Sequence, residues 1–215
     1  MSLEPGILAR GPWAADAVRT RWRGDAYAPT AAADEAADAA IAALQDRGSP
    51  SHDGLAARMS DFGTDNGRLE LELQPMRWSL RLGDDALSSI SVQCVVRDGD
   101  GRWLAGRRAP WVATWAGRWA LGAGGAIEVG EDPVETLTRE LEEEWALEPE
   151  RTQVEALVCT PNRLVLLIGQ VWVAAGAEVV RDSEHDAHAW WDPDPARWPD
   201  DASPALRGMA QLLAR

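Results

Sequence analysis

The stretch that decides the fold of this chain is GAIEVGEDPVETLTRELEEEWAL, at residues 125–147. Its middle carries the signals of a helix start, with Asp132 at the N-cap, Pro133 at the first helical position and Glu135 three residues after the cap. Apolar residues then recur at helical spacing and predict a single buried face, made of Val134, Leu137, Leu141 and Trp145. The stretch therefore predicts an amphipathic helix that follows a glycine-containing turn.

Three glutamates of this helix fall on the face beside the buried one. Glu140, Glu143 and Glu144 are three or four positions apart, so their like charges are neighbours and repel each other. They also lie near the helix C-terminus, where the helix dipole disfavours anions, and each effect costs up to ~1 kcal/mol. An acidic run alone is usually a solvated helix face. A choice that opposes local stability can also indicate a functional site, and clustered carboxylates are suitable ligands for a hard divalent cation.

The spacing of the whole stretch resembles the Nudix box, G-x5-E-x7-R-E-U-x-E-E-x-G-U, in which U is a bulky aliphatic residue. The matching positions are Gly125, Glu131, Arg139, Glu140, Leu141, Glu143, Glu144 and Leu147. Ala146 stands where the family has glycine, which leaves the geometry of the helix end open. The resemblance implies an α/β fold, namely a Nudix α/β/α sandwich with a mixed β-sheet at residues 86–215. Residues 1–85 would then form an N-terminal α+β extension that acts as a cap, a lid or an interface.

The resemblance also implies an activity, the hydrolysis of a diphosphate linked to another group with the help of Mg²⁺ or Mn²⁺. The implied metal ligands are the carboxylates of Glu140, Glu143 and Glu144 and the carbonyl of Gly124. Arg139 would orient a glutamate. The base that activates water would be Glu140 or Glu143. In some family members this base lies in a loop outside the box.

Four residues before the box and one after it are further candidates for the active site. Glu184 is the loop base that the resemblance suggests. Arg107 and Arg108 end a predicted strand, where guanidinium groups can bind phosphate, although surface arginines are common. Trp111 and Trp115 lie in the following loop and can stack on a nucleobase or simply pack the loop.

The elements outside the box are predicted from periodicity and from turn residues. The turn Asp98–Gly101 joins two predicted strands into a hairpin. Expected strands lie at residues 6–13, 69–73, 88–96, 102–107, 154–159, 164–173 and 187–191. Expected helices lie at residues 14–23, 31–44 and 204–214.

Composition limits the partners and the compartment. The net charge of −14 argues against a sequence-independent nucleic-acid binder, which needs a basic surface. Cys94 and Cys159 lie in apolar runs and are expected to be buried free thiols, which fits a reducing cytoplasm. The N-terminus lacks a signal-peptide core and no run approaches ~20 apolar residues, so no membrane partner is expected. His52, His185 and His188 occur in polar segments and are expected to be exposed.

Three functional hypotheses follow. The first is a magnesium-dependent pyrophosphohydrolase that acts on a nucleotide sugar or a nucleoside triphosphate, with a small-molecule nucleotide as partner and a homodimer as a possible assembly. The second is a Nudix-like module that binds a nucleotide without cutting it. Such a module is expected to lose box carboxylates, and all are present here. The third is an isopentenyl diphosphate isomerase, which shares the fold but uses a cysteine in a histidine-bearing motif that neither Cys94 nor Cys159 has nearby.

Overall fold

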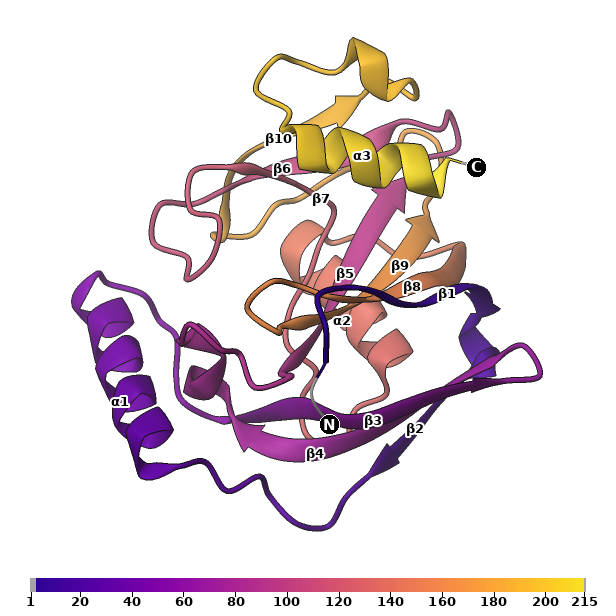
Figure 1. Cartoon of the computed structure of the whole chain (residues 1–215). Coiled ribbons are helices and arrows are strands. Elements are labelled where there is room, and N and C mark those ends of the chain that lie inside the picture. Colours follow the sequence, from indigo (N-terminus) through magenta and orange to yellow (C-terminus); the bar gives the residue numbers. More distant parts are fainter. Residues whose placement is uncertain (1–2, 215) are drawn as a thin grey trace.

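The computed structural model describes residues 3–214 and is built around a seven-stranded mixed sheet (Figure 1). Its strands are β1 (Gly6–Ala14), β5 (Ile90–Arg97), β6 (Trp103–Arg108), β7 (Trp119–Leu121), β8 (Arg151–Cys159), β9 (Val165–Trp172) and β10 (His185–Trp191). They are ordered β1-β8-β9-β5-β6-β10, with β7 paired to β6. The central pair β5 and β9 is parallel, and the other pairs are antiparallel.

A smaller sheet is formed by the N-terminal part of the chain. Its order is β2-β4-β3, with β2 (Val18–Trp22), β3 (Leu55–Asp65) and β4 (Arg68–Arg77). The helix predicted at residues 14–23 is wrong, because a short 3-10 turn, η1 (Ala15–Ala17), leads into strand β2. Arg19 and Arg21 point to solvent and alternate with the less exposed Val18, Thr20 and Trp22. This is the two-residue period of a strand. Strand β3 was not predicted.

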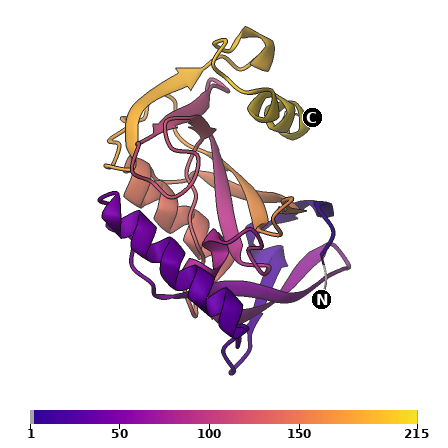
Figure 2. The same cartoon turned by 60° about the vertical axis from the view of Figure 1, so that its left-hand side comes forward.

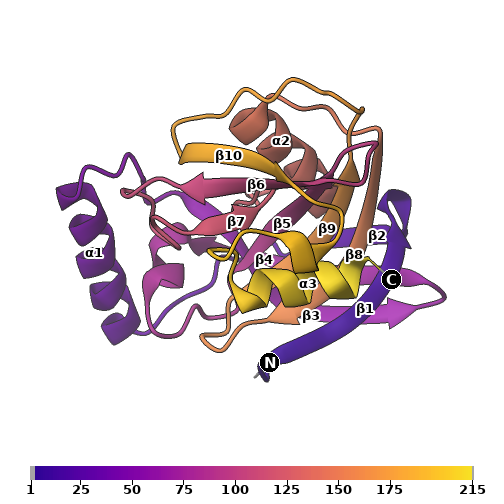
Figure 3. The ribbon, with the colours of Figure 1, turned by 90° about the horizontal axis from the view of Figure 1, so that it is seen from above.

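Helices cover both faces of the main sheet (Figure 3). The box helix α2 (Pro133–Trp145) buries Leu137, Leu141 and Trp145 in one core with the main sheet and with the inner face of the small sheet. Helix α3 (Pro204–Leu213) packs Leu206 and Ala210 on the opposite face of the main sheet. The predicted α/β/α sandwich is therefore confirmed.

Tryptophan fills much of the core on the α3 side. The ring of Trp198 lies 5.8 Å from that of Trp103 and 4.9 Å from that of Trp191, measured between centroids. Cys94 and Cys159 are buried free thiols, as predicted. Within residues 3–214, no helix has the length and apolar composition needed to cross a membrane.

The predicted hairpin of β5 and β6 exists only next to its turn, where Arg97 pairs with Trp103. Beyond that pair the segment leading into the box lies between the two strands. The Gly122 N–H donates to the Leu104 carbonyl at 2.8 Å, and Ala123 exchanges hydrogen bonds with Cys94. Gly122 has a positive φ of 61°, and a Cβ there would lie 1.9 Å from the Cys94 oxygen. Glycine is thus required at position 122 for the segment before the box to lie between β5 and β6.

The N-terminal part of the chain holds the box directly. The Ala57 N–H of β3 donates to the Ile127 carbonyl at 2.8 Å. From β2, the Thr20 hydroxyl donates to the Asp132 carboxylate at 3.1 Å, and the Trp22 indole donates to the Glu131 carbonyl at 3.1 Å. Both ends of the loop before α2 are therefore fixed by residues 1–85.

Helix α1 (Ala31–Asp46) lies at one side of the molecule and comes forward in Figure 2. It packs on the 3-10 helix η2 (Trp78–Leu82), and Arg77 joins the two through ion pairs with Asp34 at 2.5 Å, Asp38 at 2.6 Å and Asp53. Burial opposes ionisation of Asp53, but hydrogen bonds from Arg77 and from the Ser79 N–H hold its pKa below the ordinary value. Arg77 therefore fixes α1 and the loop after it against η2.

Helix α2 ends on Ala146 in the left-handed conformation, with φ 52° and ψ 40°. Alanine adopts this conformation at a cost of ~1 kcal/mol or more, whereas glycine does so freely. We expect Ala146→Gly to stabilise the protein by about 1 kcal/mol and to raise the melting temperature by roughly 2–4 °C, as scaled for a chain of this size. Calorimetric unfolding measures both quantities.

The matched control is Ala214→Gly, at the C-cap of α3, where φ is −81°. Glycine there relieves no strain and should be neutral or destabilising. Equal stabilisation by both variants would contradict a strained Ala146.

Candidate active site

The box helix begins as the sequence predicts. The Asp132 carboxylate accepts a hydrogen bond from the Val134 N–H at 2.9 Å, and the Glu135 carboxylate accepts one from the Asp132 N–H at 3.1 Å. This reciprocal capping satisfies N–H groups that would otherwise lack partners at the helix start. The start of α2, and with it the direction of its acidic face, is therefore fixed locally.

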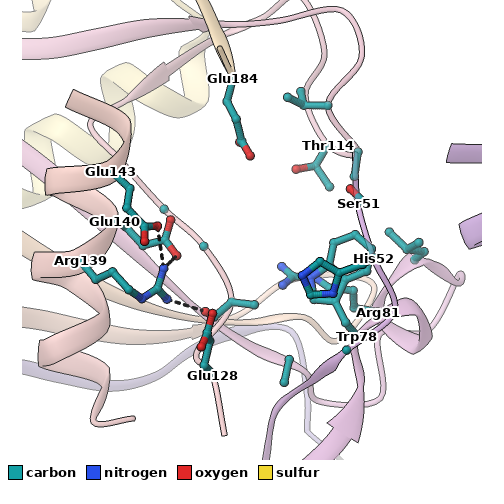
Figure 4. A pocket seen from close by; sticks show the side chains of 18 of the residues that line it. Ser51, His52, Trp78, Arg81, Thr114, Glu128, Arg139, Glu140, Glu143 and Glu184 are labelled. Carbon is teal, nitrogen blue, oxygen red and sulfur yellow. Dashed lines mark hydrogen bonds and ion pairs between the residues drawn. The ribbon is translucent and has the colours of Figure 1, made fainter. Parts of the chain in front are cut away.

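Arg139 is the hub of the acidic face (Figure 4). Its Nε donates to Glu131 at 2.7 Å, and one terminal nitrogen donates to Glu140 at 2.8 Å and to Glu143 at 2.9 Å. Glu131 is held in turn by the Thr136 hydroxyl and the Glu128 N–H. The hydrogen bond to Glu131 is the main reason why the pKa of Arg139 is raised. One guanidinium thus sets the positions of three carboxylates.

Glu140 and Glu144 are buried, with 9% and 4% of their surfaces exposed. Burial is the main cause that raises the pKa of Glu140 to about 7, with Arg139 opposing it, and burial also raises the pKa of Glu144 well above its ordinary value. The Glu144 Oε1 accepts a hydrogen bond from the Gly124 N–H at 3.3 Å. Its Oε2 has no hydrogen-bond partner among residues 3–214. A buried carboxylate oxygen without a donor is costly, so this site favours a bound cation.

The carboxylate and carbonyl oxygens at this site are the ligand type that a hard cation prefers, but the side chains are not arranged as a complete coordination sphere. In the described part of the chain, no three acidic, histidine or cysteine side chains converge in a metal-binding arrangement. The Glu143 side chain pairs with Arg139, but it is 59% exposed and therefore has room to rotate toward a cation. Magnesium usually keeps several water or phosphate oxygens, so two or three carboxylates suffice.

Gly125 is required by the close approach of Glu140. A Cβ at this position would lie 2.1 Å from the Glu140 Oε1, well inside contact distance. The glycine turn therefore lets the buried carboxylate sit directly against the backbone.

A cavity of about 490 Å³ lies in front of this acidic face. Predicted site residues that line it are Arg108, Trp111, Gly124, Arg139, Glu140, Glu143 and Glu184. A second hollow of about 470 Å³ adjoins it and is lined by two further predicted residues, Trp115 and Glu144. Glu184 pairs with Arg108 at 3.0 Å, which places the loop acid across the cavity mouth from the box helix (Figure 4).

Arg107 and His185 depart from the sequence-based expectations. Arg107 lines neither hollow and instead pairs with Asp186 at 2.6 Å, because neighbouring strand residues point to opposite faces. Its proposed role in substrate binding is not supported. His185 is buried rather than exposed, since its ring packs on Trp145 at 4.3 Å and its Nδ1 lies 3.2 Å from Asp182. His52 and His188 are exposed, as expected.

Sequence reasoning missed the residues that the N-terminal part brings to the cavity. Ser51 and His52 come from the loop after α1, while Trp78 and Arg81 come from η2 (Figure 4). They lie more than forty positions before the box, and no motif links them to it. The one signal was the cluster of arginines and tryptophan in MRWSLRL, at residues 76–82.

Fold and box together define a hydrolase that acts on phosphorus-containing anhydrides. Residues 88–213, more than half of the chain, match the model of the NUDIX domain, and the chain belongs to the Nudix family. Members of this family generally need divalent metal ions. No curated protein sequence matches the chain significantly.

The solved structures to which the chain is similar include MutT and NUDIX proteins, at low sequence identity. The MutT protein from Methanosarcina mazei Go1 is 25% identical, with 57% of this chain and 90% of that chain covered and a TM-score of 0.46. A MutT NUDIX hydrolase from Burkholderia pseudomallei is 23% identical, with coverages of 58% and 97% and a TM-score of 0.47. The NUDIX domain of Shewanella oneidensis NrtR, complexed with ADP ribose, is 17% identical, with coverages of 58% and 85% and a TM-score of 0.48.

The raised pKa of Glu140 predicts how stability depends on pH in metal-free protein. Between about pH 4.5 and 7 the folded state keeps a proton that the unfolded state releases, so this contribution is present below pH 4.5 and is lost as the pH rises toward 7. The upper limit is ~3 kcal/mol, at ~1.4 kcal/mol for each pKa unit. Glu140→Gln should remove this part of the pH dependence, as measured by denaturant unfolding with a chelator present. A difference between wild type and variant that does not change with pH would contradict the assignment.

Proposed function

We propose that this protein is a Mg²⁺-dependent (or Mn²⁺-dependent) pyrophosphohydrolase that cleaves the diphosphate of a nucleoside diphosphate linked to another group, in the class of nucleotide sugars or nucleoside triphosphates. The observation that carries the proposal is the pair of buried carboxylates, Glu140 and Glu144. Both lie beside the Gly124-Gly125 turn with too little positive charge around them. A divalent cation and its phosphate ligand would complete this arrangement.

Each residue has a part in the proposed reaction. Glu140, Glu144 and, after rotation of its side chain, Glu143 would hold the metal ion together with the Gly124 carbonyl. A bound metal ion would neutralise the diphosphate, polarise the P–O bond and acidify water. Arg139 keeps Glu140 and Glu143 in place. Water adds to phosphorus, the bridging P–O bond breaks, and the leaving phosphate takes the electron pair.

The proton released by the attacking water needs a base near the cavity. Glu140 and Glu143 are the candidates on the helix, because their carboxylates lie at the acidic face that lines the cavity. Glu184 is the candidate on the loop, where it already pairs with Arg108. The retention of every box carboxylate favours an enzyme over a module that only binds nucleotides.

A substrate panel tests the function. The protein is incubated with Mg²⁺ and with nucleoside triphosphates, nucleotide sugars, dinucleotides and NADH, and the products are resolved by mass. Cleavage of a diphosphate by the wild type but not by Glu144→Gln supports the proposal and identifies the broken bond. Binding without turnover across the panel would favour the nucleotide-binding module.

Single glutamate variants test the metal and base assignments. Glu143→Gln and Glu144→Gln should each lower kcat by about 100-fold or more, the lower range for loss of an active-site acid–base group. Thermal stability in chelator should be retained or raised, because each variant removes one charge from a repelling cluster. Steady-state kinetics and calorimetry provide the measurements.

The control for these variants is Glu142→Gln, an exposed position on the same turn of α2. It should keep wild-type kinetics. Unchanged activity in both Glu143→Gln and Glu144→Gln would show that the metal assignment is wrong.

A further inference from the structure

The active-site cavity and the second hollow meet where they share part of their lining, which we call the junction. The residues shared by both linings are Arg81, Arg108, Thr114, Gly124 and Gly125. Each hollow lies within the size range of a small-molecule site. The buried carboxylates lie on either side of this junction, since Glu140 faces the first hollow and Glu144 faces the second. A substrate that spans the junction would therefore place its central phosphates beside both carboxylates.

The two hollows differ in chemistry. The second contains Trp115, Pro161 and Leu164, which offer an aromatic and aliphatic surface of the kind that receives a nucleobase. The first contains Ser51 and His52 as well as Trp78 and Trp111, so it offers polar atoms and a stacking surface to a group such as a sugar or a second nucleoside. The linings thus match a ligand with a bulky ring-containing group at each end.

Arg81 is the cation at the junction that carries no ion pair. Its terminal nitrogen donates to the Ser91 hydroxyl at 2.7 Å, and within residues 3–214 no carboxylate lies within 4.0 Å of its guanidinium. By contrast, Arg108 pairs with Glu184 and Arg139 pairs with Glu131. Burial lowers the pKa of Arg81 to about 10, so it stays charged at neutral pH. A partly buried cation without an ion pair favours an anionic ligand.

The position of Arg81 is fixed by the N-terminal part of the chain. Arg81 belongs to η2, whose Ser79 N–H donates to Asp53 at 3.0 Å, and Asp53 is bound by Arg77. Across the cavity from Arg81 lie Arg139 and Glu140 on α2 (Figure 4). The guanidinium therefore faces the glutamates from the opposite wall, where the phosphates of a bound diphosphate would lie between them.

We propose that the substrate is a diphosphate with a bulky group on each side, and that Arg81 binds its phosphates where the two hollows meet. A nucleoside triphosphate carries a bulky group on one side of its phosphates only, so a nucleotide sugar or a dinucleotide matches the two linings better. This proposal rests on the proposed hydrolase function and narrows its substrate class. It also makes residues 1–85 a structural part of the active site, as a cap over the box helix.

The test compares Arg81→Met with the control Arg107→Met, which replaces an arginine that lines neither hollow and pairs with Asp186. Substrates are ADP-ribose, diadenosine diphosphate and ATP, each with Mg²⁺. In the wild type, kcat/KM for the first two should exceed that for ATP by at least about tenfold. Arg81→Met should raise their KM by about 10- to 100-fold, as expected for the loss of a charge-assisted hydrogen bond, with a smaller change in kcat. Arg107→Met should match the wild type.

A second variant and a pH profile test whether Arg81 acts by binding the phosphates. Ser91→Ala removes the hydrogen bond that orients Arg81 but keeps its charge, and it should raise KM by a smaller factor than Arg81→Met. If Arg81 served only to tune the ionisation of Glu140, Arg81→Met would shift the pH profile of kcat and leave KM unchanged. That result would overturn the proposal.

The remaining outcomes distinguish this proposal from the proposed function. Equal or better turnover of ATP would overturn the two-sided substrate while leaving the hydrolase in place. Absence of any turnover, with ADP-ribose binding detected by calorimetry and lost in Arg81→Met, would refute the hydrolase and support the ligand assignment. Absence of both turnover and binding of the two-sided ligands would overturn this proposal.

Discussion

The burial of Glu140 and Glu144 is the constraint on which the rest of the site depends. Their carboxylates lie on the helix whose other face fills the core between the two sheets, so they cannot move to solvent without disrupting that core. Burial raises the pKa of both groups. Arg139 pairs with Glu140 at 2.8 Å. Among the described residues, the basic groups nearest to Glu144 are more distant, with His185 at 3.7 Å and Arg108 at 3.9 Å. The buried carboxylates therefore remain incompletely neutralised, and a site with this property favours the binding of a cation.

The N-terminal part of the chain completes the site and is not merely attached to it. Strands β2 and β3 fix the loop before the box helix, and their apolar faces share the core with α2. Strand β1 forms the edge of the main sheet beside β8. Through η2 the same segment contributes Arg81 and Trp78 to the cavity wall. One set of contacts thus positions both the acidic helix and the arginine that faces it.

The sequence predicted the elements whose signals are local. The start of α2, its buried stripe and the α/β/α sandwich followed from capping residues, apolar periodicity and the box spacing. The strand β2 was misjudged because its arginines hid a two-residue alternation that only pairing with β4 reveals. Arg81 was missed because its role depends on contacts between segments far apart in the chain. For Arg107 and Arg108 the sequence does not show which of two adjacent arginines faces the cavity, and the structure places Arg108 there while Arg107 pairs with Asp186.

The helix end shows how the box and the loop acid are coupled without the usual glycine. Ala146 takes the left-handed turn, and the carbonyls of Glu144 and Trp145 then accept hydrogen bonds from the N–H groups of Asp182 and Val180, at 3.0 and 3.1 Å. These bonds satisfy acceptors that a helix C-terminus leaves open. The same segment continues directly into Glu184, two residues later. The position of the loop acid is therefore set by the backbone of the helix that carries the buried carboxylates, so the two walls of the cavity mouth are built from one hydrogen-bonded unit.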